Sequence, residues 1–247
     1  YPPLKLDLNK KDLDSLGYLK LDKLKIVLPC RTGKRSQQLL FKEQMVYELY
    51  EAIDTNYILT RLIDFVIEDG DKELFSGKAL LVEHEDHYRL RKNAELLERG
   101  GVALSILDRE VWTKMRFFQY MVGNTDWSIF NRHNVEIVKL ADGRIIPVPY
   151  DFDYCGFVGQ GYAVPHPSLP IESVQDRYFK RGPITESEFD QTLKYYLSME
   201  EALLNINQQA TYLDDDARFE NKKFLEDFFR VLRRPREMKY QALDFEQ

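Results

Sequence analysis

The chain has 247 residues and a net charge of −6 at pH 7, which argues against general nucleic-acid binding because that activity needs a basic surface. Its 44% hydrophobic and 31% charged residues are typical of a globular protein, and no apolar run approaches the roughly 18 residues that span a bilayer. A chain of this length can bury a large core, either as one bilobed domain or as two small domains.

Two features of the sequence concern the cellular compartment of the protein but do not decide it. Cys30 and Cys155 are too few for a disulfide framework, and two unpaired thiols are the simpler interpretation. The chain begins with Tyr1 rather than Met, which is compatible with the removal of a signal peptide or another leader. The compartment is therefore open, and export is one option.

The first third of the chain predicts strands and one helix. Alternating apolar and polar residues predict the first two strands, and a continuous apolar run predicts a buried strand later. An amphipathic pattern predicts the helix, with Ser36 as its N-cap. The expected elements are strands over 4–8 and 23–28, a helix over 36–53, an apolar stretch over 57–67 ended by a turn over 68–71, and a strand over 79–83.

From about residue 86 the pattern becomes mainly helical. Asp108 is expected to cap a helix that runs to Val122 and is apolar nearly all round, so we expect it to be buried. Further helices are expected over 186–204 and 217–233, with Pro235 ending the last one.

The most informative segment lies over residues 123–153. Its Asp142-Gly143 pair separates two apolar runs, over 135–138 and 145–148, and this is a strong hairpin signal. A hairpin brings its two ends together, so the polar residues that flank it should converge. Those residues are Asp126, Asn134, Asp151 and Asp153.

Oxygen ligands of this kind suit Mg²⁺ that holds a polyphosphate, and a remaining carboxylate can orient an attacking hydroxyl. Asp126 is the only acidic residue between Val111 and Val135, so no neighbour in the chain competes with it for orienting the attacking hydroxyl.

The arrangement resembles the protein-kinase-like superfamily and, within it, the CotH-type (spore coat protein H) family of atypical kinases. The matching residues are Asp126, His133-Asn134-Val135 and Tyr150-Asp151-Phe152-Asp153. The resemblance is most specific over about 117–158, is fainter over the first hundred residues, and says little about 185–247. Ordinary protein kinases place four residues between the catalytic Asp and the Asn. Seven lie between Asp126 and Asn134, so the assignment of Asp126 depends on how a longer loop folds.

The resemblance implies an α+β, bilobed, protein-kinase-like fold. Residues 1–85 would form a small lobe, an antiparallel sheet with one helix, and 86–247 a larger, mainly helical lobe with the catalytic loop and the metal-binding hairpin. The implied activity is an ATP- and Mg²⁺- or Mn²⁺-dependent transfer of phosphate to a hydroxyl on a protein or small molecule. Asp126 would orient that hydroxyl. Asn134 and Asp151 would hold the metal, and Asp153 would hold a second metal or support the first.

Kinase-like sites also use a strand lysine on the α- and β-phosphates, held by a helix glutamate. Lys25 is the strand candidate because it lies mid-strand, although a solvated lysine is the alternative. Glu43 is favoured over Glu48 because it lies on the apolar helix face, where a carboxylate needs a cationic partner or another hydrogen bond. The linker at Val82 and Glu83 is expected to offer backbone groups to adenine.

Weaker signals surround this site. No G-x-G-x-x-G loop occurs, so a phosphate-covering loop would have to come from elsewhere, with 14–18 as the candidate. His84 and His87 lack a nearby third metal ligand and are more typical of surface histidines. Four basic residues could form a rim over the cleft for an anionic substrate, or could be ordinary surface charge; they are Arg132, Arg177, Lys180 and Arg181.

Three alternatives stay open. Asp151-Phe152-Asp153 alone also resembles the metal site of nucleotide-sugar glycosyltransferases, which would require alternating parallel strands and helices before residue 150. A kinase-like domain without activity could bind nucleotide or a partner as a scaffold, although such domains usually lack a residue like Asp126. Transfer of AMP instead of phosphate would use the same metal ligands.

Overall fold

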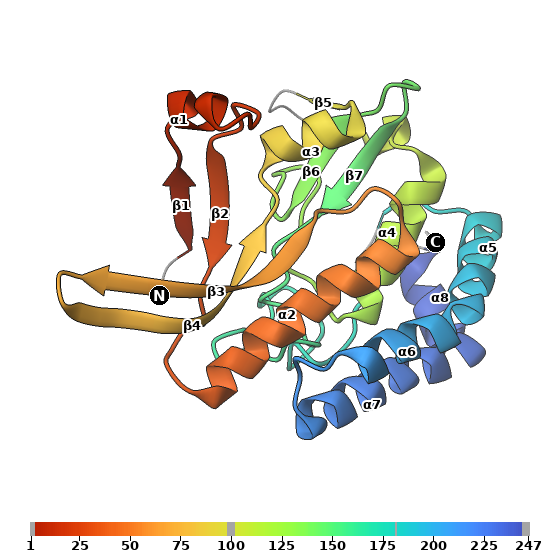
Figure 1. Ribbon diagram of the computed structural model, residues 1–247. Helices are drawn as coiled ribbons and strands as arrows, with labels where there is room; N and C mark the ends of the chain where they lie inside the picture. The colour runs from red at the N-terminus through yellow and green to blue at the C-terminus, as the bar shows by residue number, and fades with distance from the viewer. Residues whose placement is uncertain (1–2, 98–101, 181, 244–247) are drawn as a thin grey trace.

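The computed structural model describes residues 3–97, 102–180 and 182–243. Figure 1 shows a sheet built from the first part of the chain, a long helix (α2) lying between this sheet and the rest, and a mainly helical remainder. Among the described residues no helix is both long and apolar enough to cross a membrane.

The larger sheet has four strands in the order β1-β2-β4-β3, and each neighbouring pair is antiparallel. Its strands are β1 (Leu4–Asp7), β2 (Lys23–Val27), β3 (Thr60–Asp69) and β4 (Lys72–Val82). They lie where the alternating patterns predict strands, and β3 and β4 extend to either side of the predicted turn. Val82 of β4 is paired with Lys25 of β2 on one side and with Thr60 of β3 on the other.

A short helix, α1 (Lys10–Ser15), connects β1 to β2 and is capped by the side chain of Asn9. Asp14 and Ser15 therefore lie in a helix, and of the candidate covering loop over 14–18 only the part from Leu16 onward is non-helical. The turn that follows exposes the large apolar side chains of Leu16, Tyr18 and Leu19.

Helix α2 (Lys34–Ile53) begins two residues before the predicted N-cap Ser36, and its N-cap is Gly33. Gly33 has a φ of 111°, a conformation that favours glycine, and it makes no side-chain capping bond. Eleven residues of α2 are buried, because the helix packs against the sheet on one side and against helices on the other.

The remainder holds six further helices among the described residues, a 3₁₀ turn over Leu104–Ile106 and a three-stranded antiparallel sheet in the order β5-β6-β7. The helices are α3 (Glu85–Lys92), α4 (Arg109–Met121), α5 (Glu186–Ser198), α6 (Glu200–Gln209), α7 (Asp215–Arg233) and α8 (Arg236–Ala242). The strands are β5 (Glu95–Leu96), β6 (Val135–Lys139) and β7 (Ile145–Pro149).

One prediction about the helices is wrong. The helix expected over 186–204 is two helices, because Met199 ends α5 and also begins α6. The end of α7 at Arg233, just before Pro235, is as predicted, but Pro235 is also the N-cap of a further helix, α8, that was not expected. A proline is tolerated at a helix start because the N–H that it lacks would have no partner there.

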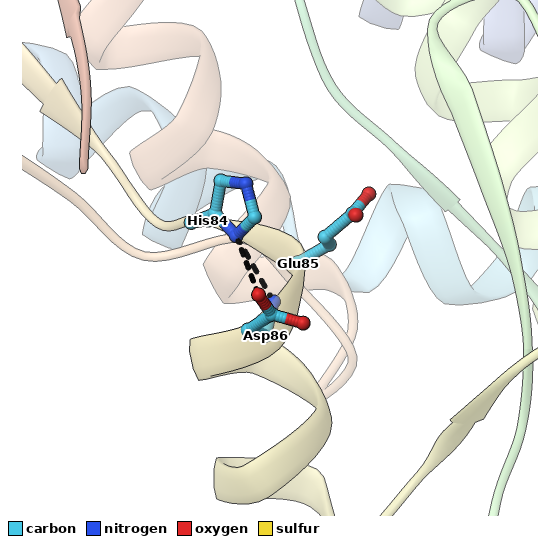
Figure 2. A group of neighbouring side chains, drawn as sticks. All are labelled: His84, Glu85 and Asp86. Atoms are coloured by element: carbon cyan, nitrogen blue, oxygen red, sulfur yellow. Dashed lines mark hydrogen bonds and ion pairs between the residues drawn. The ribbon is translucent and has the colours of Figure 1, made fainter. Parts of the chain in front are cut away.

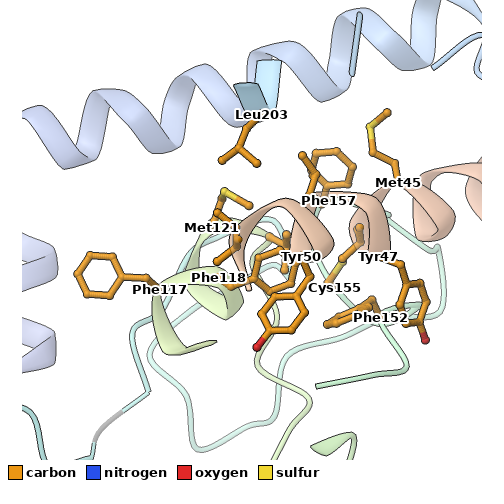
Figure 3. Packing of buried hydrophobic residues seen from close by; sticks show 14 of the residues in the cluster. Met45, Tyr47, Tyr50, Phe117, Phe118, Met121, Phe152, Cys155, Phe157 and Leu203 are labelled. Carbon is orange, nitrogen blue, oxygen red and sulfur yellow. The ribbon is translucent and has the colours of Figure 1, made fainter. Parts of the chain in front are cut away.

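The largest hydrophobic core is shared between α2 and the helical part. Figure 3 shows Tyr47 and Tyr50 of α2 beside Phe118 of α4 and Phe152. The ring centroids of Tyr50 and Phe118 lie 4.7 Å apart, and those of Tyr47 and Phe152 lie 4.9 Å apart. The segment that follows β7 is thus packed directly onto α2.

Candidate functional site

The predicted hairpin is present as β6 and β7. Val135 pairs with Pro149, and the turn at the other end contains Gly143 with a φ of 89°. At the open end the backbone N–H of Tyr150 donates to the carbonyl oxygen of Asn134 at 3.0 Å. The hairpin therefore places Asn134 next to the segment that carries Asp151 and Asp153, as the pattern predicts.

The long loop between Asp126 and Asn134 folds back on itself. The backbones of Ser128 and His133 exchange two hydrogen bonds, of 2.9 and 3.0 Å, which closes the loop into a small turn. Asn134 Nδ2 then donates to the backbone oxygen of Asp126 at 2.8 Å and to its Oδ2 at 3.1 Å. His133 Nε2 lies 3.0 Å from Asp126 Oδ1. The structure thus brings Asp126 beside Asn134 despite the longer spacing.

Three non-glycine residues of this site have a left-handed backbone, namely Arg132, Asn134 and Asp151, with φ values of 47°, 54° and 60°. This conformation is uncommon outside glycine, although Asn and Asp tolerate it best. Such residues cluster at functional sites, where the surrounding structure holds them against their preference.

The end of the hairpin faces the sheet. Lys25 Nζ, from β2, lies 3.6 Å from Asp151 Oδ2 and 5.7 Å from the ring centre of Tyr150. Asp153 Oδ2 accepts a hydrogen bond from the Tyr162 hydroxyl at 2.5 Å. Burial, and secondarily the charges of Asp151 and Asp126, raise the pKa of Asp153, while the bond from Tyr162 lowers it. The three aspartates therefore share one electrostatic environment.

Glu43 reaches the same place from α2. It is 2% exposed, and its Oε1 has no hydrogen-bond partner among the described residues. Burial raises the pKa of Glu43 well above its usual value, Asp151 and Asp153 raise it further, and Lys25 lowers it. Glu48, its competitor, instead accepts hydrogen bonds from Gln44 and Tyr212. The expected ion pair between Lys25 and Glu43 is not formed, because Lys25 pairs with Asp151.

The linker is engaged in structural contacts. Val82 lies in β4 between two strands, and the backbone N–H of Glu83 donates to the Leu59 carbonyl at 2.8 Å. The Glu83 carboxylate binds Arg91 through two bonds of 2.7 and 2.8 Å. The N–H of Glu83 is thus occupied, and its carbonyl is the backbone group left as a candidate for adenine.

The expected basic rim over the cleft is not formed by Arg132, Arg177 and Lys180. Its fourth member, Arg181, lies outside the described residues. Arg177 is half-buried and donates to the carbonyls of Met121 and Phe224. Arg132 donates to the Leu97 carbonyl. Lys180 binds backbone as well, so these cations satisfy carbonyl groups and do not form a surface patch.

Lys180 was expected only as a member of that rim, and the sequence did not reveal its contact with the loop of Asp126. Its Nζ donates to the carbonyls of Thr125 and Trp127, at 3.2 and 2.5 Å, on either side of Asp126. Burial lowers the pKa of Lys180, and the charge of Asp126 raises it. No local pattern could predict this contact, because 54 residues separate Lys180 from Asp126 in the chain.

Of the described residues only His84, Glu85 and Asp86 bring three His, Cys, Asp or Glu ligand atoms within 4.8 Å of one another. Figure 2 shows the Glu85 side chain pointing away from the other two, while His84 contacts Asp86. His84 Nδ1 accepts the backbone N–H of Asp86 at 3.3 Å and so caps α3. A helix cap accounts for this cluster.

The donor set at the hairpin fits Mg²⁺ with a polyphosphate. Because Asn134 directs its amide nitrogen to Asp126, its side-chain oxygen is left to accept or to ligate. Mg²⁺ is usually held by one or two carboxylates together with substrate phosphates, not by a complete protein cage. Asn134, Asp151 and Asp153 are oxygen donors of this kind, and their incomplete set suits an ion that arrives with a phosphate.

No protein-family model matches this chain, and neither does any curated protein sequence. Among solved structures the chain is similar to the crystal structure of a Helicobacter pylori proinflammatory kinase, CtkA. The similarity covers 88% of this chain and 92% of that one, with a TM-score of 0.50 and 8% sequence identity. At this identity the likeness shows the fold, which is α+β, bilobed and kinase-like, and leaves the function to the site.

Proposed function

We propose that the chain is an ATP- and Mg²⁺- or Mn²⁺-dependent phosphotransferase of the atypical, CotH-like kinase type. The observation that carries this proposal is the convergence of four side chains from distant parts of the chain. Lys25 comes from β2, Asp126 from the loop after α4, and Asn134 and Asp151 from the two ends of the hairpin. These are the residue types that kinase-like sites use for phosphate, acceptor and metal.

The contacts of each residue support a role for it in this proposal. Lys25, already beside a carboxylate, would move its ammonium to the α- and β-phosphates, with the Glu43 carboxyl nearby to accept a hydrogen bond from it. Asn134 and Asp151 would ligate the metal, which supplies neutralisation of phosphate charge, and Asp153 would add a second carboxylate. Asp126, oriented by His133 and Asn134, would accept the proton of the acceptor hydroxyl.

We further propose that residues 1–85 form the small lobe and 86–247 the large lobe, with adenine meeting the backbone near Val82 and Glu83. The acceptor is a hydroxyl on a protein or a small molecule. The antiparallel pairing of the larger sheet disfavours the glycosyltransferase alternative, which requires parallel strands. The presence of Asp126 in a formed loop disfavours an inactive scaffold.

Metal-dependent nucleotide binding tests this proposal. A ligand at a hundred times its Kd stabilises the native state by about 2.7 kcal/mol, or roughly 5–10 °C in Tm for a chain of this size. ATP with Mg²⁺ or Mn²⁺ should therefore raise the Tm of the wild type but not of Asp151→Ala. Asp71→Ala, in the exposed β3–β4 turn, is the matched control and should behave as the wild type. Equal shifts in Asp151→Ala and the wild type would remove Asp151 as a metal ligand.

Label position then separates the two transfer reactions. With ATP labelled at the γ-phosphate, phosphoryl transfer leaves label on the acceptor, and the protein itself can serve as that acceptor. With ATP labelled at the α-phosphate, only AMP transfer does so. Wild-type protein that binds nucleotide with metal but transfers neither label to itself or to any candidate acceptor would favour the scaffold.

A further inference from the structure

Helix α2 touches the segment of Asp151 through a second side chain besides Glu43. Tyr47 lies one helical turn after Glu43, on the same face of α2, and is 3% exposed. Its hydroxyl oxygen accepts the backbone N–H of Asp151 at 2.9 Å. These two residues are 104 positions apart in the chain, so the hydrogen bond joins α2 directly to the exit of the hairpin.

The hydrogen bond to Tyr47 constrains the backbone of Asp151, which has an unfavourable conformation. Asp151 has a φ of 60°, in the left-handed region that L-residues other than glycine avoid. Tyr47 supplies an acceptor for the N–H of Asp151 only while that N–H points toward α2. The hydrogen bond therefore stabilises the left-handed arrangement, which in turn fixes where the Asp151 carboxylate points.

The ring of Tyr47 contacts Phe152, the residue after Asp151. It packs edge-on against the ring of Phe152, with centroids 4.9 Å apart and an interplanar angle of 72° (Figure 3). Phe152 is fully buried and also contacts Phe118 of α4, at 5.6 Å between centroids. The ring and the hydroxyl of Tyr47 thus hold two consecutive residues, and both contacts depend on the position of α2.

We propose that Tyr47 is a positioning residue, whose hydroxyl fixes the backbone of Asp151 and so raises the affinity of the site for metal. This inference rests on the proposed role of Asp151 as a metal ligand. Loss of the Tyr47 hydroxyl would release the N–H of Asp151 and let its backbone leave the left-handed region. The site would then lose affinity for the metal with its nucleotide, although no ligand itself had changed.

The chain provides a matched control on the same helix. Tyr50 is also buried, at 1% exposure, but its hydroxyl has no hydrogen-bond partner among the described residues. Tyr47→Phe and Tyr50→Phe both keep an aromatic ring and remove one buried hydroxyl. Only Tyr47→Phe removes the acceptor of the Asp151 N–H, so a difference between the two variants reports that hydrogen bond.

Amide hydrogen exchange tests the contact without any ligand. The N–H of Asp151 should exchange slowly in the wild type and in Tyr50→Phe, and at least tenfold faster in Tyr47→Phe, because about 1.4 kcal/mol of protection corresponds to a factor of ten. Equal exchange rates in all three proteins would overturn the inference.

A metal titration tests the consequence. At fixed ATP, the Mg²⁺ concentration at half-maximal thermal shift should rise roughly tenfold in Tyr47→Phe, the effect of losing one hydrogen bond, and stay unchanged in Tyr50→Phe. Saturating metal should restore label transfer, so that the apparent KM for the metal changes more than kcat. An unchanged midpoint in Tyr47→Phe, or an equal rise in Tyr50→Phe, would overturn the role. If Asp151→Ala keeps its metal response, the proposed function fails at this residue, while amide exchange still decides the contact.

Discussion

Asp126 is held by atoms that belong to both ends of its loop. Its carboxylate contacts His133 and Asn134, its N–H donates to Asn124 Oδ1 at 2.9 Å, and Lys180 binds the carbonyls that flank it. A carboxylate with both oxygens engaged in this way is held in one orientation. This arrangement suits a group that positions an acceptor hydroxyl, because such a group works mainly in the transition state.

We therefore expect Asp126→Asn to retain ATP binding while losing roughly a hundredfold or more in transfer, the usual scale for a positioned acid–base group. Thermal shift with ATP and metal measures the binding, and labelled ATP measures the transfer. Asp71→Asn, in an exposed turn, is the control and should keep both. If label transfer survives Asp126→Asn, catalysis lies elsewhere, with Asp153 the next residue to change.

Among the helices and strands, α2 combines a largely buried surface with two polar side chains at the candidate site. It presents Glu43 and Tyr47 to the site and packs Tyr50 into the core that it shares with α4. Glu43 is costly there, because a buried carboxylate near two others resists ionisation. A structural core position would be filled more stably by an apolar residue, so its presence is an argument for function.

This burial gives a pH-dependent prediction. Because the folded-state pKa of Glu43 is raised above 4.5, the folded protein holds a proton there that the unfolded chain releases as pH rises through that value. Stability is thus lost progressively from about pH 4.5 up to the folded pKa. Glu43→Gln cannot ionise, so its Tm should be close to that of the wild type near pH 4.5 and should exceed it increasingly as the pH rises above that value.

Differential scanning measurements across this pH range, without nucleotide, would show the divergence; each kcal/mol corresponds to about 2–4 °C at this size. Glu51→Gln, at the exposed side of the same helix, is the control and should follow the wild type. A constant offset between Glu43→Gln and the wild type at every pH would mean that Glu43 is ionised in the folded protein.

At the scale of the whole molecule, the two lobes share one core. The cluster around α2 includes Met45 and Tyr50 together with Phe118 of α4 and Phe228 of α7. Tyr195 of α5 also donates its hydroxyl to the carbonyl of Ile53, at the end of α2, at 2.8 Å. Removing the helical part would expose this face of α2 to water, at roughly 25 cal/mol for each Å² of apolar surface.

We predict that residues 1–85 do not fold alone and that the full chain unfolds in one cooperative transition. Calorimetry should give a single peak whose calorimetric and van't Hoff enthalpies agree. The isolated fragment should show poorly dispersed amide resonances. A folded fragment, or two separate transitions in the full chain, would show that the lobes are independently stable.

The local pattern of the sequence was sufficient for most of the longer elements and for the convergence of the hairpin ends, but not for α1, for α8 or for the division between α5 and α6. Alternation predicts β2, a continuous apolar run predicts the buried end of β4, amphipathicity predicts α2, and an apolar surface nearly all round predicts α4. Asp142-Gly143 predicts the hairpin that joins Asn134 to the segment of Asp151. These signals are local because backbone geometry and side-chain period act over a few residues.

Contacts between distant residues were decided by the tertiary structure alone. The sequence does not show that Lys25 pairs with Asp151 instead of Glu43, that Tyr47 binds the Asp151 N–H, or that Lys180 reaches the loop of Asp126. It also does not show that Arg177 donates to the carbonyls of Met121 and Phe224. Each of these outcomes depends on which surfaces pack together, and a lysine or tyrosine has the same local pattern whether it faces water or a carbonyl group. Packing selects one partner for each of them because a buried polar group without a partner is costly.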